Sequence, residues 1–268
     1  MTVRWHNADI AWERFDPASV DPNMVAVVKA AALVERNAGD YVAYLRNVFA
    51  DDADFRAAAE TWGDEETQHG LALGRWAELA DPGFDFAGSM DRFTAHYRLP
   101  VEAAHSVRGS RAGELIARCI VECGTSSLYS ALRDASAEPV LKDICNRIAG
   151  DEFRHYKLFH EHYRRYERDG GLGLFARLRV AVGRIVEAED DELARAWWAA
   201  NDWTSAYDRK ACANAYAARA GRFYRYGHVK RAVGMTLKAC KLAPQGWLAN
   251  VAARVCWVLL QQRNRRLV

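Results

Sequence analysis

The sequence contains no pair of cysteines separated by two residues. Its six cysteines occupy positions 119, 123, 145, 212, 240 and 256. This spacing argues against rubredoxin-like and zinc-ribbon centres, and against the disulfide framework of a small secreted domain. We interpret the cysteines as small apolar residues within helices.

Long apolar runs are also absent. No run reaches the length of about eighteen residues that a membrane-spanning helix requires. The first residues, MTVRWHNADIAWERFD, carry Trp, His and acids where a signal peptide needs a basic stub and an apolar core. We therefore expect a cytoplasmic protein.

Acidic residues are scarce near the C-terminus. Residues 203–268 contain thirteen Lys or Arg against one acid, Asp208, for a net charge of +12. The whole chain has 37 basic and 35 acidic residues, so residues 1–202 hold 24 and 34, for a net charge of −10. This polarity indicates either a polyanionic partner or attraction between the two parts of the chain.

Apolar residues recur at helical spacing in four long segments. We expect helices over residues 22–50, 54–80, 111–136 and 139–166. The connection over residues 81–110 carries Gly, Pro and Ser, and we expect a short helix in it after Pro100. The pattern predicts an all-α protein with a four-helix bundle.

The segment from Asp169 to Gly173 is rich in glycine and indicates a boundary. We therefore expect a bundle domain over residues 1–170 and a C-terminal helical extension over residues 171–268, the latter basic and rich in aromatic residues from about residue 203. Residues 174–201 are expected to form one or two further helices.

Two copies of the pattern Glu-x-x-His fall within these helices, at Glu66 and His69 and at Glu152 and His155. Residues three apart share one face of a helix, so each copy presents a carboxylate and an imidazole together. Each copy follows a single glutamate on an inward helical stripe, with Glu35 31 residues before Glu66 and Glu122 30 residues before Glu152. This is the ligand set of a carboxylate-bridged two-metal site in a four-helix bundle.

Four carboxylates and two imidazoles, without thiolate, suit iron or manganese. We expect two Fe ions, with Mn as the alternative. Glu65 and Asp151 each precede a ligand glutamate, and each could accept the ring N–H of the other half's histidine, Asp151 from His69 and Glu65 from His155. The alternative for these two acids is a solvated helix surface.

Thr125 follows Glu122 by almost one helical turn. Its hydroxyl could act beside the metals as a catalytic group that hydrogen-bonds an oxygen species or relays a proton. It could equally bond to the backbone carbonyl four residues back.

A third Glu-x-x-His, at Glu102 and His105, stands among helix-breaking residues of the connection and has no partner glutamate upstream. We interpret it as a coincidence.

These motifs resemble a known family. The segment WGDEETQHG is similar to the Trp-x-x-Glu-Glu-x-x-His-Gly segment of the soluble acyl-carrier-protein desaturases, which are ferritin-like di-iron enzymes. The stretches ECGTSSLYSALRD and PVLKDICNRIAGDEFRH resemble their Glu-x-x-Thr and Ile-Ala-x-Asp-Glu-x-x-His segments. The resemblance covers residues 25–165 and implies a ferritin-like di-iron carboxylate bundle.

Under this resemblance, six residues are iron ligands and Thr125 matches the threonine beside the oxygen-binding face. The ligands are Glu35, Glu66, His69, Glu122, Glu152 and His155. The implied chemistry is O2-dependent, desaturase- or monooxygenase-type oxidation of an apolar substrate carried by an acyl carrier protein. The implied partners are O2, an external electron donor such as a ferredoxin, and an acyl carrier protein. An acidic carrier protein could dock on the basic C-terminal region.

The basic region has no counterpart in that family, so other functions stay open. The chain could be an RNA-modifying di-iron hydroxylase whose basic and aromatic residues contact nucleic acid. It could also be a non-enzymatic ferritin-like protein that handles iron or scavenges peroxide. A membrane surface as partner of the basic region, and a homodimer, are further alternatives.

Overall fold

The computed structural model describes residues 4–168, 171–187 and 191–267, and within these ranges it contains eleven α-helices and no strand. The all-α prediction is thus confirmed for the described part of the chain. The expected boundary at residues 169–173 lies partly outside it, because residues 169 and 170 are not described. The helices are α1 (Pro22–Arg36), α2 (Ala38–Val48), α3 (Ala53–Ala80), α4 (Phe86–His96), α5 (Arg111–Ala135), α6 (Pro139–Arg168), α7 (Leu174–Glu187), α8 (Asp191–Trp197), α9 (Arg209–Ala220), α10 (Tyr226–Ala239) and α11 (Trp247–Leu267).

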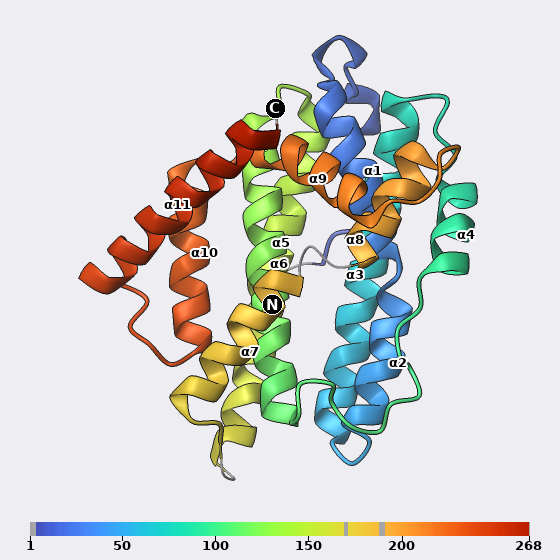
Figure 1. Ribbon diagram of the computed structural model, residues 1–268. Helices are drawn as coiled ribbons and strands as arrows, with labels where there is room; N and C mark the ends of the chain where they lie inside the picture. The colour runs from blue at the N-terminus through green and yellow to red at the C-terminus, as the bar shows by residue number, and fades with distance from the viewer. Residues whose placement is uncertain (1–3, 169–170, 188–190, 268) are drawn as a thin grey trace.

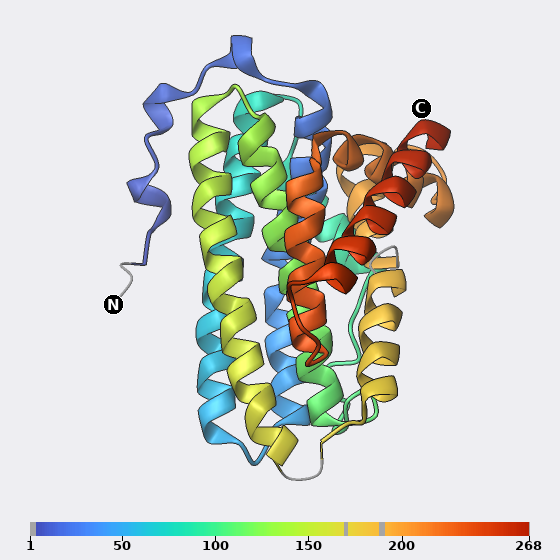
Figure 2. The same cartoon turned by 90° about the vertical axis from the view of Figure 1, so that its left-hand side faces the viewer.

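Three long helices, α3, α5 and α6, lie side by side with the successive helices α1 and α2 (Figures 1 and 2). The segment before α1 crosses the side formed by α3 and α6. It contains three short 3₁₀ helices, at Asn7–Asp9, Trp12–Arg14 and Pro17–Ser19. The helices after α6 cover the opposite side, where α7 and α10 pack on α5, and α8 and α9 pack on α1.

The long helices begin where a side chain can accept the free backbone N–H groups of the first turn. Asp52 accepts from the backbone N–H of Phe55 at 3.0 Å to start α3, and Ser110 accepts from that of Gly113 at 3.0 Å to start α5. Buried Glu138 accepts from the backbone N–H of Leu141 at 2.7 Å at the start of α6. These caps fix where each long helix enters the core.

The first expected helix is interrupted. The prediction of a continuous helix over residues 22–50 was wrong at Asn37, where α1 ends and α2 begins. The backbone of Asn37 has φ −79° and ψ 9°, and asparagine is a weak helix former because its side chain competes for backbone hydrogen bonds. The apolar stripe continues across the interruption, which is why the sequence pattern does not reveal it.

The short helix of the connection also differs from expectation. It is α4, which ends at His96, before Pro100, whereas residues 97–110 contain turns and bends. Asp85 starts this helix by accepting from the backbone N–H of Gly88 at 2.9 Å. Glu102 and His105 are both exposed in the turns that follow.

Helices α1 and α3 approach each other closely at Gly70. A Cβ atom at Gly70 would lie 2.5 Å from the backbone N of Arg36 and 2.7 Å from its Cα. No side chain fits at that distance, so glycine is required here. Because Glu35 precedes Arg36 and His69 precedes Gly70, this contact also sets the distance between two candidate metal ligands.

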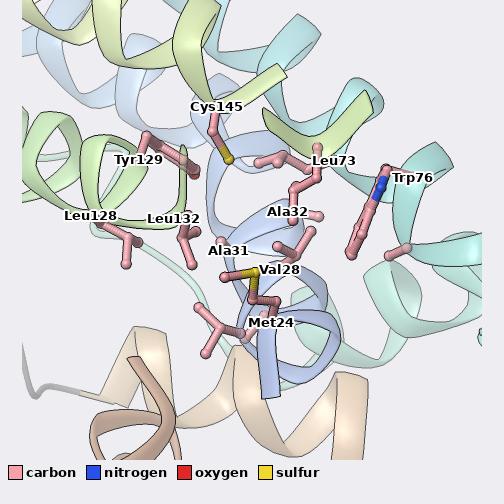
Figure 3. Close-up of a cluster of buried hydrophobic side chains, with 14 of the residues drawn as sticks. Met24, Val28, Ala31, Ala32, Leu73, Trp76, Leu128, Tyr129, Leu132 and Cys145 are labelled. Atoms are coloured by element: carbon pink, nitrogen blue, oxygen red, sulfur yellow. The ribbon is translucent and has the colours of Figure 1, made fainter. Parts of the chain in front are cut away.

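The apolar core extends along the whole molecule in two clusters. Near one end, side chains from four helices converge, including Val28 of α1, Trp76 of α3, Leu132 of α5 and Cys145 of α6 (Figure 3). Phe223, from beyond residue 170, belongs to this cluster. The second cluster likewise joins residues of α2, α3, α5 and α6 to residues after 170. The C-terminal helices therefore share the core of the preceding helices.

No helix among the described residues is both long enough and apolar enough to cross a membrane.

Candidate metal centre

Helices α1, α3, α5 and α6 each place carboxylates at one level of the core, and α3 and α6 add a histidine each. All six side chains are buried, with relative exposures between 0% and 7%. Ionisable side chains are seldom buried this completely unless they are paired or bind a metal. They are Glu35 of α1, Glu66 and His69 of α3, Glu122 of α5, and Glu152 and His155 of α6.

The six side chains form two overlapping groups, each with its ligand atoms within 4.8 Å of one another. One group contains Glu35, Glu66, His69 and Glu152, and the other contains Glu66, Glu122, Glu152 and His155. Glu66 and Glu152 belong to both groups, so each could bridge two ions. The structure thus brings together every residue of the set expected from the sequence.

Distances between the candidate ligand atoms fit binding to a shared cation. Nδ1 of His155 lies 2.9 Å from Oε1 of Glu66, and Nδ1 of His69 lies 3.4 Å from Oε1 of Glu152 and 3.5 Å from Oε2 of Glu35. Two atoms bound to one ion at about 2.1 Å, with an angle of about 90–120° between them, are about 3.0–3.6 Å apart. A metal ion fits these separations.

Each of the six side chains also has one buried atom without a hydrogen-bond partner of acceptable geometry. A buried polar atom left unpaired costs about 1–3 kcal/mol, and more when charged. Six such atoms converge on one place, and a pair of divalent cations there could bind all of them. The atoms are Oε2 of Glu35, Oε1 of Glu66, Nδ1 of His69, Oε1 of Glu122, Oε1 of Glu152 and Nδ1 of His155.

The raised pKa values of two glutamates in the cluster also favour a bound cation. Burial, reinforced by the nearby charge of Glu152, raises the pKa of Glu122 to about 8. Burial and the charges of Glu152 and Glu35 raise the pKa of Glu66 well above its ordinary value. Without added positive charge, these carboxylates therefore tend to keep their protons. Four carboxylates would balance the charge of two divalent cations.

Two acids hold the histidine rings from behind. Nε2 of His69 lies 3.0 Å from Oδ2 of Asp151, and Nε2 of His155 lies 2.7 Å from Oε2 of Glu65. Both contacts cross between α3 and α6, in the pairing expected from the sequence. Nδ1 of each ring faces the cluster. When the ring is neutral, a proton at Nε2 shared with the acid leaves Nδ1 free to bind a metal.

Asp151 and Glu65 are themselves anchored. Trp5 donates its indole N–H to Oδ2 of Asp151 at 2.7 Å, and Arg4 pairs with Oε1 of Glu65 at 2.8 Å. Arg154 pairs with Oδ1 of Asp151 at 2.5 Å. Burial by itself would raise the pKa of both carboxyls, but their hydrogen bonds to the histidines and the nearby arginines outweigh burial and lower the pKa of each. Both acids therefore stay ionised behind the rings.

The segment before α1 covers the histidine side of the cluster. The indole of Trp5 stacks on the imidazole of His69, with ring centroids 5.9 Å apart and planes inclined by 8°. Trp5 is buried, and its backbone carbonyl accepts from the side chain of Gln68 at 2.7 Å. The role of Trp5 was missed in the sequence, because no local pattern links residue 5 to a helix that begins at Ala53.

Two hydroxyl groups touch the cluster from α5. The hydroxyl of Thr125 lies 2.5 Å from Oε2 of Glu152, and also 3.3 Å from the backbone carbonyl of Val121. Tyr129, one turn further on, donates its hydroxyl to Oε1 of Glu35 at 2.5 Å. Tyr129 was not expected at the site, although its spacing of seven residues from Glu122 places it on the same helical face.

A cavity of about 360 Å³ opens beside the cluster. Its wall contains two of the candidate ligands, Glu35 and Glu66, together with Thr125. Most of the remaining wall is apolar, from residues such as Ala31, Trp62 and Leu128. The volume falls within the range of small-molecule sites, about 300–1,000 Å³. An organic molecule could therefore reach the candidate metal site.

The C-terminal helices complete this cavity. Arg184 of α7, Glu192 of α8, Tyr216 of α9, and Tyr224, which precedes α10, line it together with residues of the long helices. Arg118 of α5 lines it as well, one turn before Glu122. This arginine was missed in the sequence, although its spacing of four residues from Glu122 could have revealed it.

Neither a scan against protein-family models nor a search of curated proteins found a match to this chain.

Proposed function

We propose that this chain is a ferritin-like di-iron carboxylate oxidoreductase, a four-helix bundle that uses O2 to oxidise an apolar organic molecule. The observation that carries the proposal is the convergence of six unpaired buried atoms, from four carboxylates and two imidazoles, beside an apolar cavity. The donor set, with oxygen and nitrogen but no thiolate, favours iron or manganese. Among these, iron is the metal that supplies the redox chemistry of O2 reduction.

The chain's own residues would prepare the site for that chemistry. Glu65 and Asp151 hold the two imidazoles with Nδ1 directed inward. Tyr129 orients Glu35 through a hydrogen bond, and the hydroxyl of Thr125 offers a proton next to Glu152, at the wall of the cavity. The apolar wall would exclude water from the substrate while it is oxidised.

The resemblance to soluble acyl-carrier-protein desaturases supports desaturase- or monooxygenase-type oxidation within this class. O2 is a reactant in the proposal, and an external donor such as a ferredoxin would supply electrons. Fold and metal site by themselves do not select the reaction. The cavity is what favours an organic substrate over an iron-handling or peroxide-scavenging role, because those roles require no apolar chamber beside the metals.

Three aromatic residues of the basic region, Phe223, Tyr224 and Tyr226, pack within the protein, which favours a small substrate over RNA. Tyr224 lines the cavity and Phe223 is buried in the core, so neither ring is free to stack on a base. Tyr226 packs edge-on against Trp257, with ring centroids 6.4 Å apart. The basic charge of this region remains available for an acidic protein partner.

Metal content per chain, measured on protein purified from iron-replete cells, is the first test. We expect two iron ions per chain and, after anaerobic reduction and exposure to O2, an optical transient that depends on oxygen. Absence of iron even after anaerobic reconstitution, or zinc that does not respond to O2, would overturn the proposal. Iron that accumulates as ferric mineral would indicate iron storage instead.

A further inference from the structure

Arg118 is a buried guanidinium at the edge of the cavity. Its relative exposure is 5%, and its Nε is buried without a hydrogen-bond partner. Oε1 of Glu114 forms an ion pair with that Nε at 3.6 Å, a separation beyond hydrogen-bonding distance. A guanidinium has five N–H donors and stays charged in proteins, so burial with an unused donor is unfavourable.

The neighbours of Arg118 are engaged elsewhere. Oε2 of Glu114 accepts hydrogen bonds from the hydroxyls of Tyr44 and Ser106, both at 2.8 Å. The guanidinium lies over the ring of Tyr41, 4.6 Å from its centroid, and the hydroxyl of Tyr41 donates to Glu192 at 2.5 Å. Tyr41 and Glu114 thus hold the guanidinium in place without saturating its donors.

A carboxylate inside the cavity would supply the acceptors that Arg118 lacks. Guanidinium and carboxylate form two parallel hydrogen bonds, and this pairing is strongest where water is excluded. The acids nearby limit the charge of the ligand. Because Glu114 and Glu192 already place negative charge at this end, a doubly charged phosphate would be repelled more strongly than a carboxylate.

We infer that the cavity binds a small apolar carboxylic acid, with its carboxylate paired to Arg118. The inference rests on the proposed function only in treating this acid as the substrate, since binding to Arg118 requires no metal. It also selects a free acid over a carrier-bound acyl group, because the thioester linkage to a carrier leaves no carboxylate.

The position of Arg118 limits which part of the acid could be oxidised. Arg118 precedes Glu122 by four residues and Thr125 by seven, which corresponds to about 6 Å and about 10 Å along the helix axis. An acid anchored at Arg118 therefore brings carbons close to its carboxylate, rather than the end of a long chain, next to the candidate metal site.

Binding of octanoate and of its uncharged counterpart octanamide, measured by calorimetry on the purified protein, tests the inference. We expect octanoate to bind about 10- to 100-fold more tightly, which corresponds to charge-assisted hydrogen bonds. The preference should persist after the metals are removed, provided that circular dichroism shows the helices to be retained. Hexanoate and decanoate extend the series to shorter and longer chains.

Substitution of Arg118 supplies the second arm of the test. Arg118→Gln should lose the preference for the carboxylate and keep its metal content, and Arg118→Lys should keep part of the preference. Arg254→Gln, which removes an exposed arginine of α11, is the matched control and should behave as the unmodified protein.

Two results would overturn the inference. One is equal binding of octanoate and octanamide, or no binding by any acid of the series. The other is a preference for octanoate that survives in a folded Arg118→Gln variant. Either result, obtained on protein that holds two iron ions, leaves the proposed function intact, whereas loss of the proposed function alone would appear as missing metal with the acid preference unchanged.

Discussion

Oδ2 of Asp151 on α6 lies 3.0 Å from Nε2 of His69 on α3, so a carboxylate of one helix orients an imidazole carried by another. Asp151 directly precedes the candidate ligand Glu152 in its own helix. The metal affinity of the site should therefore depend on a residue that does not itself reach the metal.

We expect Asp151→Asn to weaken metal binding about 10- to 100-fold, as is typical when the partner of a liganding histidine is lost. The substitution keeps the shape of the side chain but removes the charge that holds the proton at Nε2 of His69. Competition with a chelator of known affinity measures the effect. Asp143→Asn, on the same helix and paired with Arg147, is the control, and an equal loss in both variants would contradict the assignment.

Substitution of a ligand that belongs to both groups should remove more metal than substitution of a ligand that belongs to one group. Glu66 and Glu152 each belong to both groups, so Glu66→Ala or Glu152→Ala should abolish metal occupancy at one or both sites. Glu35 and Glu122 belong to one group each, so Glu35→Ala or Glu122→Ala should leave the other group able to bind one ion. Elemental analysis measures the number of metal ions per chain in each variant. Two metals retained in the Glu152→Ala variant would remove the ligand assignment.

Substitution of Thr125 should change the reaction with O2 without changing metal binding. We expect Thr125→Val to retain both metals but to alter the rate at which the reduced protein reacts with O2, because the hydroxyl beside Glu152 is lost. Thr125→Ser, which keeps a hydroxyl, should restore the rate. Stopped-flow absorbance after mixing with O2 measures both variants. An unchanged rate in Thr125→Val would mean that Thr125 only packs in its helix.

The contact between α1 and α3 at Gly70 should be sensitive to a single methyl group. Gly70→Ala would force a Cβ against the backbone of Arg36, and overpacking of this kind costs about 1–3 kcal/mol of unfolding free energy. Because Glu35 and His69 flank the contact, metal affinity should fall as well.

Gly150→Ala, on α6, is the control for Gly70→Ala, since a Cβ there meets nothing within 4 Å. In an exposed helical position this change should stabilise the protein by about 0.4–1 kcal/mol. Urea unfolding of both variants measures whether the free energy of unfolding falls in Gly70→Ala and rises in Gly150→Ala. Stabilisation by Gly70→Ala would show that α1 and α3 can separate at this point without loss.

The candidate ligands could be predicted from the sequence because helical geometry converts spacing into direction. Glu66 and His69 are three residues apart and share a face, whatever the rest of the chain does. The crossed contacts of Glu65 and Asp151 followed from the similarity of the two halves. Local periodicity is enough for such features.

Other features depend on contacts between distant parts of the chain. Trp5 donates a hydrogen bond to Asp151, which lies 146 residues later in the sequence, and no pattern near either residue predicts this bond. The break at Asn37 lies within an unbroken apolar stripe, so periodicity predicts a continuous helix there. Arg118 was hidden for another reason. An arginine on an inward face usually forms a buried ion pair, and Arg118 does pair with Glu114 at 3.6 Å. The sequence does not show that this contact leaves Nε of Arg118 without a hydrogen bond, or that a cavity lies beside it.

The six unpaired buried atoms also bear on how the chain matures in the cell. If the helices closed before metal arrived, they would enclose carboxyl groups that must keep their protons, and six polar atoms would be left unpaired in a medium that solvates them poorly. Chains that acquire metal while folding avoid this state, because metal binding contributes directly to the free energy of folding. We therefore expect the yield of intact protein to follow the iron supply during synthesis. Iron added only after cell lysis should recover less of it, because chains left without metal are exposed to proteases in the meantime.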